Sequence, residues 1–250
     1  LGNRVPRMAE TSSGMLNAIG LENIGLDKFL IDKLPLLDKF KTRLIVNFFG
    51  NNNVEYIEMA SALSDISSID ALEMNVSCPN VEKGGIELSS DPAILQRVVE
   101  SVRNVTDKFL IVKLSPNVLD ITKLAIAAEN GGADAISLVN TYVGMKIDVE
   151  SGKPWLANIT GGLSGPAIKP IALAMVYKTC RAVKIPVIGI GGISSVEDAL
   201  EFLMAGARAI QIGTANYIDP SITIKIIDGL RDYCQKNNLN SLKGLCLHKT

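Results

Sequence analysis

The sequence contains little of the chemistry on which histidine-based catalysis and metal sites depend. Its one histidine, His248, lies near the end of the 250-residue chain, which argues against a histidine triad or a multi-histidine metal site. The four cysteines, Cys78, Cys180, Cys234 and Cys246, form no C-x-x-C pair, so a zinc site, an iron–sulfur cluster or a redox dithiol is not expected. This usage is typical of a reducing compartment, and we expect a cytoplasmic protein without a metal.

The chain also lacks an excess of charge of either sign and long apolar runs. It has 25 Lys+Arg against 26 Asp+Glu, and the two signs are interspersed rather than gathered in a basic face that would bind nucleic acid. Apolar stretches such as 44–49 and 124–128 fall far short of the ~20 residues that a membrane span needs. We therefore expect a small-molecule substrate, with no nucleic acid and no membrane.

What the sequence does have is a repeat of short β-branched runs with helical patterns between them. This alternation predicts parallel strands joined by helical crossovers, and no linker interrupts it. A barrel of eight βα units takes roughly 250 residues, so we expect residues 1–250 to form one α/β domain, a TIM (β/α)₈ barrel. The six predicted strands are 44–48, 71–76, 109–114, 135–140, 186–191 and 209–213.

The helical segments have recognisable ends. Asp91 and Pro92 predict a helix start, because the backbone N–H that proline lacks would have no partner within the helix at its first position. Ser194 with Glu197 matches a capping box, and Gly206 is a stop signal for the same helix. The predicted crossovers are therefore bounded on both sides.

In a parallel α/β sheet, ligands bind at the carboxyl ends of the strands, and two residues there have open interpretations. Cys78 follows the strand 71–76. A nearby cation would make its thiol a usable general base, whereas most free cysteines are small buried hydrophobes. Lys113 lies inside an apolar strand, where it either meets an anionic ligand or extends along the strand edge to solvent.

Two glycine-rich turns, 189–194 and 213–216, follow the last two predicted strands. Their backbone N–H groups, together with a helix start, predict a phosphate site, although βα loops also use glycine for geometry. A third glycine segment, 161–165, is expected to be a loop that exposes its backbone or is simply flexible.

Asparagines recur among the polar residues near the predicted site. Asn17, Asn75 and Asn140, with Thr141, can donate and accept hydrogen bonds to a planar ligand rich in amide groups. Singly, each is also a common turn or cap residue. Their clustering at strand ends favours the ligand-binding interpretation.

These segments occur in an order and spacing that match one known family from Leu1 to about residue 230. The matching motifs are 17–21, 75–80, 113–117, 140–141, 161–165, 189–193 and 211–215. With them the chain resembles the dihydroorotate dehydrogenases of class 1B, catalytic-subunit type. So many motifs together are highly specific.

The resemblance implies an FMN-containing barrel that oxidises dihydroorotate to orotate in the synthesis of pyrimidines. By the same matching, Cys78 is the base that removes a proton from carbon 5 while hydride leaves carbon 6 for the flavin. The residues that match substrate contacts are Asn17, Ala18, Ile19, Gly20, Leu21, Asn75, Asn140 and Thr141. Those that match FMN contacts are Asn47, Asn75, Lys113, Val139, Gly165, Gly191, Gly192, Gly213 and Thr214, with the last four around the phosphate.

The resemblance also implies partners. Class 1B catalytic subunits form half of a heterotetramer in which a second subunit, carrying FAD and an iron–sulfur cluster, passes electrons to NAD. We therefore expect a homodimer of this chain, with the heterotetramer as its larger assembly. NAD is the expected final acceptor, but sequences that use fumarate share this core.

The start of the chain predicts that its N-terminal part is absent. Residues 1–7 contain no initiating Met, and the six predicted βα units begin only at residue 44. Two further strands would take roughly 60 residues. In the family, a strand end and a lysine that contact FMN precede the point where Leu1 begins.

Two other interpretations stay open. The pyrimidine-reducing domain of dihydropyrimidine dehydrogenase shares the 75–79 motif and the stretch 152–155, although it has histidine where this chain has Asn80. The alternative of a different class is a catalytically inactive barrel fragment, or a scaffold that only binds a partner subunit.

Overall fold

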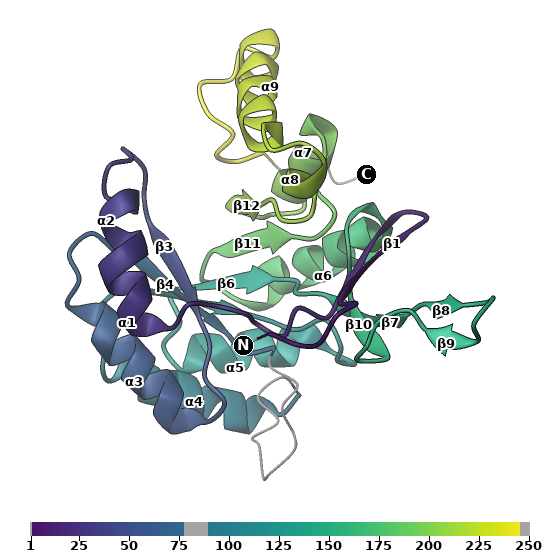
Figure 1. The fold of residues 1–250 in the computed structure, drawn as a ribbon. Helices are drawn as coiled ribbons and strands as arrows, with labels where there is room; N and C mark the ends of the chain where they lie inside the picture. Colours follow the sequence, from purple (N-terminus) through teal and green to yellow (C-terminus); the bar gives the residue numbers. More distant parts are fainter. Residues whose placement is uncertain (1, 78–89, 246–250) are drawn as a thin grey trace.

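The computed structural model describes residues 2–77 and 90–245, and its centre is a parallel sheet that curls into a half-barrel (Figure 1). The sheet has six strands in the order β12-β11-β6-β5-β4-β3, and every neighbouring pair is parallel. The strands are β3 (Ile45–Phe48), β4 (Ala71–Asn75), β5 (Phe109–Lys113), β6 (Ala135–Leu138), β11 (Val187–Ile190) and β12 (Ala209–Gln211).

The six predicted strand segments are confirmed, each within two residues at either end. They are short and rich in Val, Ile and Leu because both faces of a parallel sheet are covered. All five residues of β4 are buried, and so are all four of β6 and of β11. The six parallel strands of the described residues form an open half-barrel like part of a TIM barrel, with β12 and β3 at its two edges.

Helices cover the convex side of the sheet (Figure 1). The long ones are α3 (Asn53–Ser64), α4 (Pro92–Arg103), α5 (Ile121–Asn130), α6 (Lys169–Ala182), α7 (Val196–Met204) and α9 (Ile222–Lys236). The short ones are α1 (Leu26–Lys28), a π-helical turn (Phe29–Lys33), α2 (Leu34–Leu37), a 3₁₀ turn (Pro166–Ile168) and α8 (Ala215–Ile218). Among the described residues, no helix is long and apolar enough to cross a membrane.

The helix starts follow the predicted caps with one correction. Asp91 caps α4 by accepting hydrogen bonds from two backbone N–H groups, which satisfies donors that a helix start leaves free. The capping box of α7 is formed by Ser195 and Asp198, one residue later than the predicted pair Ser194 and Glu197. Both pairs fit the sequence pattern, and Asp198 is the one that reaches back to the turn before the helix.

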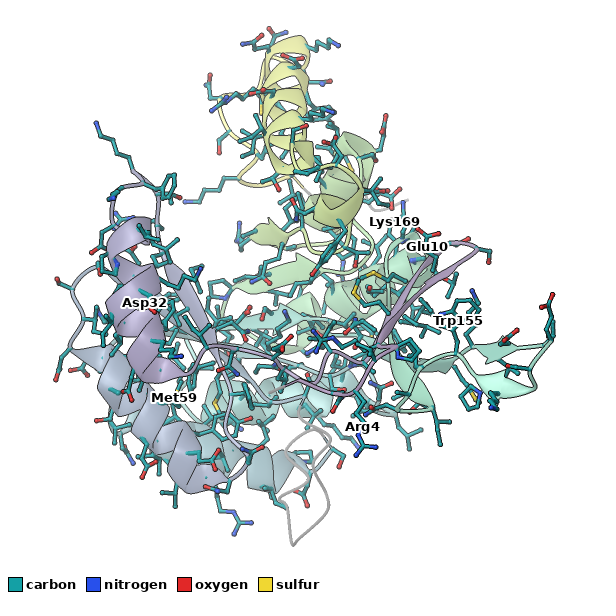
Figure 2. The ribbon with its side chains drawn as sticks, viewed as in Figure 1. Arg4, Glu10, Asp32, Met59, Trp155 and Lys169 are labelled. Carbon is teal, nitrogen blue, oxygen red and sulfur yellow. The ribbon has the colours of Figure 1, made fainter. Side chains whose placement is uncertain are left out.

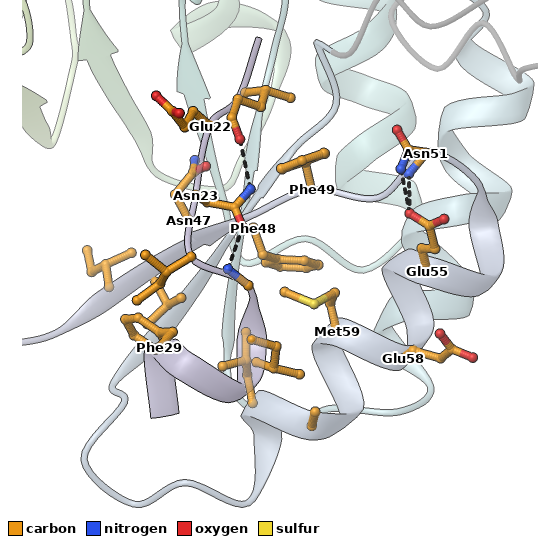
Figure 3. A pocket seen from close by; sticks show the side chains of 18 of the residues that line it. Glu22, Asn23, Phe29, Asn47, Phe48, Phe49, Asn51, Glu55, Glu58 and Met59 are labelled. Carbon is orange, nitrogen blue, oxygen red and sulfur yellow. Dashed lines mark hydrogen bonds between the residues drawn. The ribbon is translucent and has the colours of Figure 1, made fainter. Parts of the chain in front are cut away.

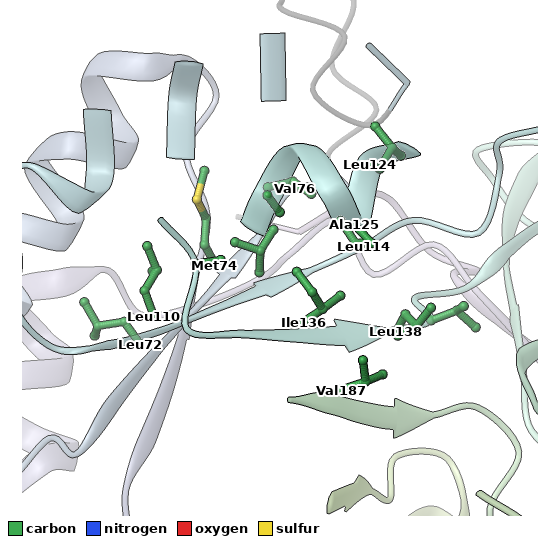
Figure 4. Close-up of a cluster of buried hydrophobic side chains, with 14 of the residues drawn as sticks. Leu72, Met74, Val76, Leu110, Leu114, Leu124, Ala125, Ile136, Leu138 and Val187 are labelled. Carbon is green, nitrogen blue, oxygen red and sulfur yellow. The ribbon is translucent and has the colours of Figure 1, made fainter. Parts of the chain in front are cut away.

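The main core lies between the sheet and these helices (Figure 4). Leu72, Met74, Leu110 and Ile136 point outward from three neighbouring strands, and Leu124 of α5 belongs to the same buried cluster. All five side chains are at most 1% exposed. Side chains alternate between the faces of a strand, so the residues between them point into the concave lumen instead.

A second, antiparallel sheet was not predicted. It is formed by β1 (Met8–Thr11), β2 (Gly14–Asn17), β10 (Thr160–Ser164) and β7 (Tyr142–Met145) in the order β1-β2-β10-β7. The loop expected over 161–165 is therefore wrong, because residues 160–164 form a strand that pairs with β7 on one side and with β2 on the other. Since β7 follows β6 after three residues, this sheet adjoins the carboxyl end of the half-barrel.

The strands β8 (Ile147–Asp148) and β9 (Lys153–Pro154) extend the second sheet as a hairpin (Figures 1 and 2). At its base, Lys146 Nζ lies 4.5 Å from the centroid of the Trp155 ring, a cation–π contact. The same Nζ donates a hydrogen bond of 2.9 Å to the carbonyl of Glu10, in β1 of the β1–β2 hairpin. Lys146 thus ties the two hairpins together.

Replacing Leu110 with alanine tests the main core. Leu110 is fully buried in the sheet, so Leu110→Ala should lower the free energy of unfolding by about 2–5 kcal/mol through lost burial and the cavity left behind. The matched control Leu119→Ala, at a fully exposed leucine, should change it by no more than about 0.5 kcal/mol. Urea unfolding followed by circular dichroism measures both, and equal losses would contradict this account of the core.

Candidate functional site

The carboxyl ends of four strands surround a cavity of about 140 Å³. Nine of the predicted cofactor and substrate residues line it, together with Ser164, Ile168 and Ile190. These nine are Lys113, Val139, Asn140, Thr141, Gly165, Gly191, Gly192, Gly213 and Thr214. Segments that are about 100 residues apart in sequence therefore meet at one place in the half-barrel.

One wall of this cavity is made of glycine backbone. Gly165, Gly191 and Gly192 have φ angles of 90°, 129° and 75°, a region that residues with a Cβ rarely adopt. A Cβ on Gly192 would also lie 2.7 Å from the carbonyl oxygen of Gly165. The close approach of these two turns therefore requires glycine at this wall.

The composition of the cavity suits the phosphate end of a ligand. Among the residues that the structure describes, no carboxylate lines it, Lys113 supplies a cation, and space is open where a Cβ of Gly213 would point. Whole small-molecule ligands occupy cavities of roughly 300–1,000 Å³, so this cavity is large enough for one end of such a ligand only. The residues that line the cavity would fit the phosphate end of a phosphate-bearing cofactor.

The turn between β11 and α7 is held from below by Asp198. Its carboxylate accepts hydrogen bonds from the backbone N–H groups of Ser194 and Ser195, at 2.8 and 3.0 Å. Lys169 Nζ donates to the same carboxylate at 2.6 Å and also contacts Glu201 (Lys169 is labelled in Figure 2). This network fixes the backbone that follows Gly191 and Gly192.

The charges of this network shift the pKa values of both partners. Burial raises the pKa of Asp198, but the hydrogen bonds from Lys169 and Ser194 outweigh burial, so the pKa lies below its ordinary value of 3.8. The hydrogen bond to Asp198 raises the pKa of Lys169 above 10.5, against the opposing effect of burial. The pair therefore stabilises the folded protein fully between about pH 3.8 and 10.5.

Lys113 and Asn47 meet at a buried carboxylate that the sequence analysis did not single out. Glu73 is 4% exposed and points into the lumen from β4. Asn47 Nδ2 donates to it at 2.6 Å, and Lys113 Nζ lies 3.9 Å away. The signal was present in the sequence, because Glu73 and Asn75 are polar at alternate positions of an otherwise apolar strand, as Lys113 is in β5.

The asparagines near the cavity contact one another. Asn140 Nδ2 donates to Asn75 Oδ1 at 3.2 Å, and Asn140 Oδ1 accepts from the backbone N–H of Thr141. Asn75 is 7% exposed, and the Tyr56 hydroxyl donates to its carbonyl. The predicted cluster of asparagines at strand ends thus exists for these two residues.

The segment from Asn17 to Leu21 does not line this cavity, and only Asn17 belongs to the second sheet. Asn17 ends β2 and pairs with Gly162 of β10, whose missing Cβ would overlap the Thr141 side chain. In the second sheet, β10 lies between Asn17 of β2 and strand β7, which follows β6. At the other end of the segment, Leu21 lines a different and larger cavity.

This larger cavity, of about 790 Å³, lies between residues 21–37, β3 and α3 (Figure 3). Phe29, Phe48 and Met59 make most of its visible wall apolar, while Asn51 donates to Glu55 at its rim. Asn47 borders it from the far side of β3. Its lining contains no glycine turn from the last two strands, so it does not share the features of the smaller cavity.

The cysteines divide between the described and undescribed parts of the chain. Cys78, the predicted base, and Cys246 lie outside the described residues. Burial raises the pKa of the Cys180 thiol to about 11, so this cysteine stays protonated at neutral pH. Among the described residues, no group of three or more His, Cys, Asp or Glu side chains could hold a metal ion.

A half-barrel of parallel strands with polar side chains at their carboxyl ends is the architecture of barrel enzymes, and the comparisons place it among the oxidoreductases. A family model for dihydroorotate dehydrogenase matches residues 1–233. The chain belongs to the dihydroorotate dehydrogenase family, which confirms the resemblance carried by its motifs. Enzymes of this family depend on a flavin.

Several bacterial relatives are similar over nearly the whole chain. Proteins of Geotalea daltonii and Parabacteroides distasonis are each 53% identical over 244 residues, which is 98% of this chain and 80% of the relative. A protein of Trichlorobacter lovleyi is 52% identical over the same share. All three carry the name dihydroorotate dehydrogenase B (NAD(+)), catalytic subunit.

Asp198→Asn tests the network beneath the glycine turn. The amide cannot balance the charge of Lys169, so the variant should lose about 1–3 kcal/mol of unfolding free energy at pH 7. The loss should shrink as the pH falls below 3.8 toward the lowered pKa of Asp198, because the wild-type carboxylate then also becomes protonated. Urea unfolding between pH 3 and 7 measures this loss. The control is Asp228→Asn, which removes an exposed ion pair with Arg231 and should change the unfolding free energy little. A loss that is independent of pH would contradict the ion-pair account.

Proposed function

We propose that this protein oxidises dihydroorotate to orotate in pyrimidine synthesis, with FMN as the bound electron acceptor. The observation that carries the proposal is the single cavity in which the cofactor motifs of the family meet, Lys113 with the turns at Gly191, Gly192, Gly213 and Thr214. When bound, FMN supplies the acceptor for the hydride that the substrate loses. The family membership and the names of the relatives support the same reaction.

In this proposal, one set of residues binds the phosphate of the cofactor and another set binds its isoalloxazine ring. The glycine turns receive the phosphate with backbone N–H groups, near the start of α7. Lys113, at the end of β5 where the cavity meets the lumen, would contact the isoalloxazine together with Asn47 and Asn75, which point into the lumen from neighbouring strands. A lysine ammonium there offsets the negative charge that a flavin gains on reduction.

The substrate is proposed to lie above the lumen, between the asparagines and the second sheet. Asn75 and Asn140 already share a hydrogen bond, and each retains amide groups that can bind a pyrimidine ring and its carboxylate. Asn17 to Leu21 contribute from β2 and the turn after it. Cys78, which follows β4 in the sequence, removes the proton from carbon 5 as hydride leaves carbon 6.

The acceptor and partners follow from the same family. We propose NAD as the final electron acceptor and a cytoplasmic assembly, in which a homodimer of this chain binds an electron-transfer subunit with FAD and an iron–sulfur cluster. The printed names of the relatives, which include NAD(+) and "catalytic subunit", support an acceptor and a partner of this kind. The described residues contain no cluster-binding group of cysteines, so such a cluster would belong to the partner.

A flavin spectrum and its bleaching test the proposed reaction. The purified protein, reconstituted with FMN, should show the yellow flavin absorbance at one FMN per chain. Under anaerobic conditions dihydroorotate should bleach this absorbance, whereas uracil and dihydrouracil should leave it unchanged. A protein that binds no FMN would favour the scaffold interpretation, and a response to dihydrouracil alone would favour a dihydropyrimidine dehydrogenase-like reaction.

Cys78→Ala tests the assignment of the base. General-base catalysis typically contributes about 10²–10⁴-fold, so the rate of flavin reduction by dihydroorotate should fall by that factor while FMN stays bound. Stopped-flow absorbance measures the rate, and Cys234→Ala on α9 is the matched control that should react at the wild-type rate. A wild-type rate in Cys78→Ala would remove Cys78 from the mechanism.

A further inference from the structure

The lumen of the half-barrel is layered from apolar to polar along the strands. Its floor is a cluster of four buried side chains, Ala71, Ile111, Ala135 and Ile188. Two residues further along β4, in the direction of the cavity, the side chain is Glu73, and two further still it is Asn75. Glu73 is therefore the first charged group above the apolar floor, directly below the residues proposed to hold the flavin.

Every hydrogen bond to Glu73 comes from a different strand. Asn47 of β3 donates to one carboxylate oxygen at 2.6 Å. Ser137 of β6 and Gln211 of β12 donate to the other oxygen, each at 2.7 Å. Glu73, on β4, thus links the two edge strands β3 and β12 to the central strand β6.

The hydrogen-bond partners of Glu73 require a charged carboxylate at this position rather than a neutral amide. The Asn47 and Gln211 side chains present amide N–H donors, and Lys113 can only donate. A glutamine in place of Glu73 would turn an NH₂ group toward donors, while a carboxylate accepts from all of them. A buried carboxylate is costly unless it is paired in this way.

Lys113 lies close to Glu73 but does not form a hydrogen bond with it. The Nζ to Oε2 distance of 3.9 Å is longer than a hydrogen bond, so the ammonium keeps its N–H donors for another acceptor. In the described part of the chain, Glu73 is the one carboxylate within 4.0 Å of Lys113. The two charges together leave the polar layer of the lumen close to neutral.

We propose that Glu73 is a positioning residue that balances the charge of Lys113 beneath the flavin and thereby lowers the reduction potential of the bound cofactor. The proposal rests on the proposed function, because it takes the ligand above Lys113 to be FMN. It goes further by assigning a role to a residue that the cofactor and substrate motifs do not include. The juxtaposition of Glu73, Lys113 and Asn47 in the lumen carries it.

The sign of the effect follows from electrostatics. A flavin gains negative charge on reduction, and an ammonium near it stabilises the reduced form. A carboxylate behind that ammonium opposes this stabilisation, and interactions inside a protein are screened less than in water. Removing the negative charge should therefore raise the potential, and removing the positive charge should lower it.

The test is the midpoint potential of the FMN-loaded protein in four forms: wild type, Glu73→Gln, Lys113→Met and the double variant. We expect a higher potential in Glu73→Gln, a lower one in Lys113→Met, and a value in the double variant above that of Lys113→Met. Spectroelectrochemistry with an indicator dye measures all four. The same potential in Glu73→Gln as in the wild type, or a lower one, would overturn the proposal.

Two controls separate charge from structure. Ser137→Ala removes one hydrogen bond to Glu73 without changing any charge, so its potential should stay at the wild-type value. Glu73→Asp keeps the charge and should also stay closer to the wild-type potential than Glu73→Gln does. If all the variants lose thermal stability while their potentials agree, the role of Glu73 is structural and the proposal is wrong.

The outcomes also distinguish this inference from the proposed function. A wild-type protein that binds no FMN overturns both. A wild-type protein that binds FMN and is reduced by dihydroorotate, with a potential that does not respond to Glu73→Gln, overturns the role of Glu73 alone. If Glu73→Gln does not fold, the comparison of Lys113→Met with the double variant Glu73→Gln/Lys113→Met decides, because equal potentials in that pair exclude an effect of the carboxylate charge.

Discussion

The alternation of side chains along the parallel strands decides where both the core and the site of this protein lie. Outward positions such as Leu72 and Leu110 are apolar and pack under the helices. Inward positions begin apolar at the closed floor of the lumen and become polar toward the carboxyl ends, as in the step from Ala71 to Glu73. A shift of one residue in strand register would exchange the two sets and remove the core and the site together.

The polar layer of the lumen also explains how the site is kept rigid. Glu73 takes hydrogen bonds from three other strands, so the positions of those strands relative to one another are tied to a single carboxylate. At the opposite wall, Asp198 does the same for the turn after Gly191 and Gly192. Both carboxylates lie behind the residues proposed to bind the cofactor, and in both cases the partner cation is a lysine.

The parts of this arrangement that depend on local sequence could be predicted, and those that depend on distant pairing could not. The six strands were predictable because short runs of β-branched residues end in glycine or polar residues. Residues 160–164 have no such run, and they form a strand only because residues 14–17 and 142–145 pair with them. Glu73 was visible as a polar residue in an apolar strand, but its partners on β3, β6 and β12 are apparent only in the folded chain.

The pairing of β2 with β10 has a further consequence for the order of folding. Asn17 and Gly162 are neighbours in this sheet although they are about 145 residues apart, and the whole parallel half-barrel except its last two strands lies between them in sequence. The entropy lost on closing so long a loop is recovered only once the intervening chain has become compact. Strand pairs of this separation form slowly, so the antiparallel sheet should assemble after the parallel core, and the side of the molecule proposed to bind substrate should be completed last.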